Sequence, residues 1–164
     1  MKGIKKRFAK LTMISKVLQF EDSDRSTFTD ADGDIAAAFD GDVDCTTLTT
    51  ECTIADKGGK IEIEYGESEI TGMEGATTRV VFDKKEPTLV SILREGSVST
   101  ALVFEESKRH HCVYQTPYFP IEMCINTITL ENELSYEGGR LVAEYLVEMN
   151  GILAEKTQIT LTVK

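Results

Sequence analysis

The fold is decided by residues 140–163, which read RLVAEYLVEMNGILAEKTQITLTV. In the first half, apolar side chains recur at every second position: Leu141, Ala143, Tyr145, Val147 and Met149. The second half ends in the same way, with Ile159, Leu161 and Val163 separated by threonines. A period of two is typical of a β-strand with one buried face. Asn150-Gly151 lies between the halves and favours a tight hairpin, because both central residues of such a turn need positive φ.

Alternation and turn signals continue through the chain from Thr46 onward. Ile61, Ile63 and Tyr65 alternate with glutamates, and turn-type residues occur at 57–60, 71–75, 83–86, 95–96, 105–108 and 137–139. Short connections place successive strands side by side and antiparallel. We therefore predict an all-β fold: a single antiparallel up-and-down meander of about 8–10 strands. Closing it into a barrel removes the exposed edges. A flattened sandwich is the alternative, and the two differ in whether the first and last strands pair.

The beginning of the chain is less regular. Residues 1–20 fit a helical stripe through Ile4, Phe8, Leu11 and Leu18, but the run Leu11–Val17 fits a strand equally well. A strand is favoured because an all-β domain needs the pairing. Residues 21–44 carry nine acids and one base, and we expect an acidic, partly disordered loop there. The length of 164 residues suits one domain spanning 1–164.

Composition narrows the classes of partner. The net charge is −10, although residues 1–20 hold six bases and no acid. Nucleic-acid binding needs a basic footprint, so no nucleic-acid partner is expected. No apolar run reaches signal-peptide or membrane-spanning length, which indicates a cytoplasmic protein with no membrane partner, as a monomer or homodimer. The four cysteines form no Cys-x-x-Cys pair and are expected to be free thiols.

Several short strings resemble those of a known family. They are residues 65–78 (YGESEITGMEGATT), Leu93–Gly96, Phe104-Glu105, Tyr114–Tyr118 and Thr127. In this order they resemble the YwiB-like family of small bacterial proteins, over about residues 46–164. The resemblance implies a calycin-like, lipocalin-like β-barrel with no established activity, and it supplies no catalytic residues. Two departures are Phe119-Pro120, where a Gly is usual, and Cys52, where a Gly is expected.

Polar side chains at the end of one predicted strand are the first candidate site. Tyr65, Glu67 and Glu69 share the parity of Ile61 and Ile63, so a regular strand turns them into the barrel. Arg94 shares parity with Val90 and Ile92 and would pair with one of the carboxylates. Such a pair could bind the polar head of a ligand. Alternatively, a bulge at Gly66 turns both glutamates outward, and Arg94 reaches solvent.

A second group of polar residues predicts a band inside the barrel. Tyr114 and Thr116 lie on one strand face, and with Thr78 and Thr127 they would place a few polar groups among apolar walls, as in a small-molecule pocket. The alternative is Thr and Tyr pairing on the outer surface. His110 shares parity with Tyr114 and could act as an acid or base, or could be idle in solvent.

The acidic loop offers one metal-binding pattern. Asp30, Asp32 and Asp34 begin like a calcium loop, but Ile35 and Gly41 stand where that loop needs Gly and Glu, so a solvated loop is the alternative. No phosphate-binding or dinucleotide motif appears, and no cofactor is expected.

The sequence therefore predicts a barrel that binds a small molecule, with the ligand-binding set Tyr65, Glu67, Glu69, Thr78, Arg94, His110, Tyr114, Thr116 and Thr127. Two further hypotheses remain open. The interior Glu, Arg and His could run acid–base catalysis, or the acidic loop could bind a protein partner.

Overall fold

The computed structural model describes residues 3–20, 43–68, 74–96, 99–115 and 117–164. These residues form ten strands. The strands are β1 (Lys5–Gln19), β2 (Asp44–Lys57), β3 (Lys60–Gly66), β4 (Thr77–Asp83), β5 (Glu86–Glu95), β6 (Thr100–Glu105), β7 (Arg109–Gln115), β8 (Pro120–Asn132), β9 (Gly139–Met149) and β10 (Ile152–Val163). Among the described residues, none belongs to a helix long and apolar enough to span a membrane.

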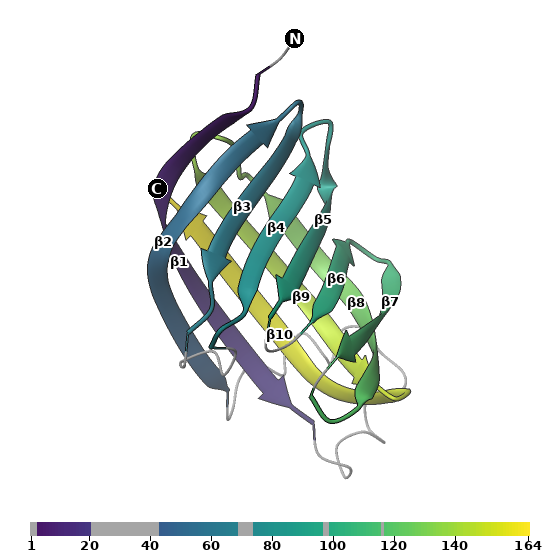
Figure 1. Ribbon diagram of the computed structural model, residues 1–164. Helices are drawn as coiled ribbons and strands as arrows, with labels where there is room; N and C mark the ends of the chain where they lie inside the picture. The colour runs from purple at the N-terminus through teal and green to yellow at the C-terminus, as the bar shows by residue number, and fades with distance from the viewer. Residues whose placement is uncertain (1–2, 21–42, 69–73, 97–98, 116) are drawn as a thin grey trace.

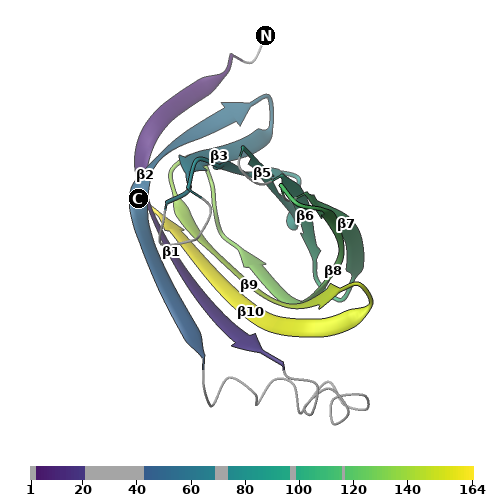
Figure 2. The ribbon, with the colours of Figure 1, turned by 60° about the horizontal axis from the view of Figure 1, so that its bottom comes forward.

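The strands form one antiparallel sheet in the order β6-β5-β4-β3-β2-β1-β10-β9-β8-β7 (Figure 1). The first and last strands pair from Leu11 opposite Val163 to Gln19 opposite Glu155. This pairing is the feature that distinguishes a barrel from a sandwich, and Figure 2 shows the sheet curling into an oval ring. The ring is nearly closed. Between β6 and β7, the described residues add one isolated bridge, from Ser99 to Gln115, and we call this junction the seam.

Local sequence explains the elements. Asn150 and Gly151 have φ values of 51° and 79°, as a tight hairpin between β9 and β10 requires. The beginning of the chain, where the sequence suits a helix or a strand equally well, forms the long strand β1. This strand pairs with β2 on one side and with β10 on the other. The predicted acidic loop, except for its last residues, lies outside the described residues.

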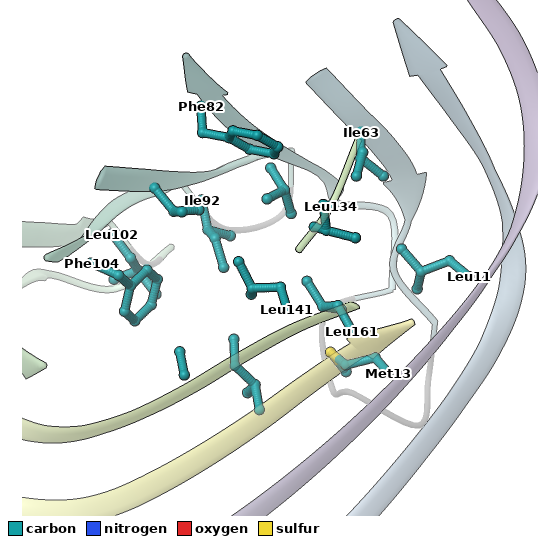
Figure 3. Close-up of a cluster of buried hydrophobic side chains, with 14 of the residues drawn as sticks. Leu11, Met13, Ile63, Phe82, Ile92, Leu102, Phe104, Leu134, Leu141 and Leu161 are labelled. Carbon is teal, nitrogen blue, oxygen red and sulfur yellow. The ribbon is translucent and has the colours of Figure 1, made fainter. Parts of the chain in front are cut away.

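The core fills the interior with the alternating side chains of every strand. Leu11, Ile54, Ile61, Leu141 and Leu161 are almost completely buried. Figure 3 shows such side chains from opposite walls pointing toward one another. Phe104 of β6 meets Tyr145 of β9 edge-to-face, with ring centroids 4.8 Å apart. Burial of this apolar surface is the main force that holds the two walls together.

The two ends of the barrel differ. At one end the connections follow residues 57, 83, 105 and 132, and we call it the turn end. At the other end they follow residues 19, 66, 95, 115 and 149, and we call it the pocket end. Figure 1 shows the turn end at the top, near both chain termini, and the pocket end at the bottom.

Candidate functional site

Four polar side chains form a row across neighbouring strands near the pocket end. Tyr65 of β3 lies opposite Thr78 of β4, Thr78 lies opposite Arg94 of β5, and Arg94 lies opposite Thr100 of β6. Residues directly opposite one another in antiparallel strands share a face of the sheet. Tyr65, Thr78 and Thr100 are buried, so the shared face is the interior.

A second polar row runs across the opposite wall. Thr127 of β8 lies opposite Tyr145 of β9, which lies opposite Thr157 of β10. All three are buried. The structure therefore contains a polar band inside the barrel, and Thr78 and Thr127 belong to it. Thr100, Tyr145 and Thr157 were not singled out from the sequence, although Tyr145 lies in the alternating pattern of residues 141–149.

Glu67 and Arg94 point into the barrel. The Glu67 side chain has no exposed surface, and its Oε1 accepts a hydrogen bond of 2.6 Å from Thr78 Oγ1. Arg94 Nε lies 3.8 Å from the same oxygen, which is an ion pair but too long for a hydrogen bond. The Arg94 side chain is 18% exposed. A buried carboxylate needs such partners, because removing a charge from water is costly.

Several polar atoms in this interior lack partners. Arg94 Nε, Glu67 Oε2 and the hydroxyl oxygens of Thr100, Thr127 and Thr157 are buried without a hydrogen bond to the described residues. Folded proteins satisfy most of their buried polar groups, and each exception calls for an explanation. Here the exceptions are concentrated in the two polar rows and the adjoining ion pair.

A pocket of about 270 Å³ opens beside Arg94. Its apolar walls come from β6, β8 and β9 and consist of Leu102, Ile121, Met123, Ile125, Val147 and Met149. Its polar groups are Arg94, Tyr114, Tyr145 and Glu155. Tyr114, Ile121, Met149 and Glu155 are half-buried, so the pocket reaches solvent. Apolar walls with a few directed polar groups are typical of small-molecule sites.

A β-bulge places Glu155 in this pocket. Leu153 lies opposite Glu148 and Glu155 lies opposite Val147, so Ala154 is the extra residue in β10. Val147 is an interior residue, and the bulge brings Glu155 to the same face. Burial raises the pKa of the Glu155 carboxyl group, and the neighbouring hydroxyl group of Thr157 opposes this rise to a smaller extent. The protonated carboxyl form is therefore favoured relative to a carboxyl group in water.

The two interior tyrosines are neutral at physiological pH. Burial raises the pKa of Tyr145 to about 12, against the opposing influence of Arg94. The pKa of Tyr65 is also raised, first by burial and then by the charge of Glu67. Both phenols therefore keep their protons and can donate hydrogen bonds. The Tyr65 hydroxyl lies 3.8 Å from Met13 Sδ, a weak acceptor.

The remaining candidate residues lie elsewhere. His110 is near the turn end of β7, where its Nε2 is 3.1 Å from Glu105 Oε1, and it does not line the pocket. Glu69, Thr116, Asp30, Asp32 and Asp34 lie outside the described residues. Within the described ranges, no group of three His, Cys, Asp or Glu residues is placed to hold a metal ion. The four cysteines are free.

The fold and the interior define a class: a nearly closed, antiparallel up-and-down β-barrel with a polar band and a pocket inside it. A family model described as "Domain of unknown function (DUF1934)" matches residues 36–161. The chain therefore belongs to this family.

One solved structure has the same fold. It is that of the ywiB protein from Bacillus subtilis, with a TM-score of 0.62 and 15% sequence identity, covering 96% of this chain and 93% of that one. The likeness agrees with the YwiB-like resemblance of the sequence and extends it to the first strand. A search of curated proteins found no match.

Proposed function

We propose that this protein binds a small, mostly apolar molecule in the interior pocket, with the polar group of the ligand at Arg94. The observation that carries the proposal is the pocket of about 270 Å³, where six apolar side chains meet Arg94, Tyr114, Tyr145 and Glu155. Its volume is at the small end of ligand sites. Arg94, which lines this pocket and whose Nε makes no hydrogen bond to the described residues, supports the proposal, because a ligand or ordered water would supply a partner.

The seam supports exchange of a ligand with solvent. Leu102 of β6 and Tyr114 of β7 both line the pocket, and these strands flank the seam. Ser99 and Gln115 exchange two backbone hydrogen bonds, of 3.2 and 2.8 Å, at the pocket end of the seam. A junction with so few ladder bonds separates at lower cost than the fully paired junction of β1 with β10.

In this proposal the predicted ligand-binding residues take different parts. Arg94 and Tyr114 contact the ligand, while Glu67 pairs with Arg94 and Thr78 donates a hydrogen bond to Glu67. Tyr65 lies next to Thr78 in the same polar row. Thr127 belongs to the opposite polar row. The protein would act as a lipocalin-like carrier in a bacterial cytoplasm, as a monomer or homodimer. Acid–base catalysis and partner binding through residues 21–44 remain hypotheses.

Native mass spectrometry of protein purified from its own cells tests the proposal. We expect a discrete extra mass that is released on unfolding. Ile121→Trp fills the pocket and should abolish the extra mass. Val113→Trp, on a neighbouring strand but 45% exposed on the outer face, is the matched control and should retain it. A bare polypeptide mass for the wild type, with no heat on titration with octanoate, 1-octanol or octylamine, would contradict the proposal.

A further inference from the structure

Three of the four polar groups that line the pocket can donate hydrogen bonds. Arg94 carries N–H donors and no acceptor, and Tyr114 and Tyr145 carry phenolic O–H groups. Glu155 is the fourth polar group of the lining, and it is an acid whose pKa is raised by burial. A ligand that fits this arrangement presents hydrogen-bond acceptors at its polar end.

Arg94 is the strongest of these donors and has unused capacity. Its Nε forms the ion pair with Glu67 at 3.8 Å, and this nitrogen makes no hydrogen bond to the described residues. A guanidinium has a rigid, planar fork of donors that matches the two oxygens of a carboxylate. Arg94 also lines the pocket, so an anion bound there would lie next to its positive charge.

The charge balance favours a single negative charge on the ligand. Arg94 supplies one positive charge, which Glu67 already shares, and Glu155 is a second acid at the pocket. A doubly charged phosphate would add repulsion from both acids in a partly desolvated site. A carboxylate brings one charge and two acceptor oxygens.

The size of the pocket limits the apolar part of the ligand. A volume of about 270 Å³ corresponds to roughly ten non-hydrogen atoms, if each occupies about the 30 Å³ of a liquid water molecule. The walls of Ile121, Met123, Ile125, Val147 and Met149 offer no polar partner along the body of such a molecule.

We infer that the ligand is a small amphipathic monocarboxylate, either a medium-chain alkanoate or an arylalkanoate. Its carboxylate binds the guanidinium of Arg94 and the hydroxyl of Tyr145, and its apolar body lies against β8 and β9. This inference rests on the proposed function, and it adds the chemical class of the ligand and the residue that selects it.

Isothermal titration calorimetry at neutral pH tests the inference with three eight-carbon probes that differ in their polar group: octanoate, 1-octanol and octylamine. We expect octanoate to bind at least about tenfold more tightly than either of the others, since a hydrogen-bonded charge contributes about 1.5–3 kcal/mol. Arg94→Met should reduce octanoate affinity by about 10–100-fold and reduce the affinity for 1-octanol by a clearly smaller factor, because 1-octanol carries no charge. Arg79→Met is the matched control, because Arg79 lies on the outer face of β4, where it pairs with Glu62 and Glu95.

Arg94→Met leaves the buried Glu67 without its cation, so the double variant Arg94→Met/Glu67→Gln provides a neutral interior if the single variant does not fold. It should bind octanoate no better than 1-octanol. Equal affinity of the wild type for octanoate and either other probe would overturn the inference and leave the proposed function standing. Undiminished octanoate binding by the double variant would also overturn the inference and leave the proposed function standing. Failure of all three probes to bind the wild type would overturn both.

Discussion

The strands of this barrel run from one end to the other, but the interior is packed with apolar side chains at the turn end and contains polar side chains and a pocket at the pocket end. Toward the turn end, Leu11, Ile61, Leu141 and Leu161 fill the interior and leave almost no exposed surface. Toward the pocket end, Glu67, which follows β3, and Thr78 and Arg94 of β4 and β5 lie inside, and Arg94 lines a pocket. The difference shows that alternation along a strand decides which side chains point into the barrel. Whether those side chains are apolar or polar decides whether that end of the interior is filled or contains a pocket.

The largest expected effect distinguishes the packed end from the open one. Leu141→Ala should lower the free energy of unfolding by about 2–5 kcal/mol, because it creates a cavity in a filled core. Met149→Ala, in the half-buried pocket wall, should cost about 1 kcal/mol, since the space beside it is already open. Urea unfolding monitored by circular dichroism measures both. Equal losses would show that the pocket end is packed as tightly as the turn end.

The next effect concerns the polar row itself. Thr78→Val removes the hydrogen bond donated to the buried Glu67 and should cost about 1.5–3 kcal/mol. Thr100→Val, in the same row, removes a buried hydroxyl that has no partner among the described residues. It should leave the free energy of unfolding unchanged or raise it by about 1 kcal/mol. A loss at Thr100 as large as at Thr78 would mean that its hydroxyl is also bonded in the folded protein.

The smallest effect depends on pH. Burial raises the pKa of Glu155 in the folded protein, so the protonated side chain favours the folded state. This stabilisation is fully present below the ordinary carboxyl pKa of about 4.3 and is lost as the pH rises through the pKa of Glu155 in the folded protein. Glu155→Gln should therefore match the wild type at pH 4 and unfold at a higher temperature at pH 7.5. Scanning calorimetry at both pH values measures this. Glu64→Gln, on the exposed face of β3, should show no such pH-dependent gain.

Much of the barrel could be predicted because its determinants are local. Alternation and turn residues specify antiparallel neighbours, and Asn150-Gly151 even fixes the turn type. The first segment was ambiguous because its apolar residues suit two periods. Its pairing partner β10 resolves the ambiguity, and β10 lies far away in the sequence.

The site could be predicted only in part, for two physical reasons. Parity correctly turned Glu67 and Arg94 inward, but parity gives the face of the sheet and not the position along the barrel axis. It therefore grouped His110 with a pocket that His110 does not line. Glu155 enters the pocket through a bulge at Ala154, and no turn residue or break in the pattern marks that bulge in the sequence. The height and the bulge both depend on register between strands.

The pairing of β1 with β10 also governs how the chain folds as it is synthesised. β2 follows β1 along the chain and can pair with it early, but the other edge of β1 has no partner until β10 has been made. An unpaired strand edge invites association with other chains, and contacts between distant segments form slowly. Most of the six bases of residues 1–20 lie on β1, and their mutual repulsion would disfavour pairing between the β1 edges of two nascent chains.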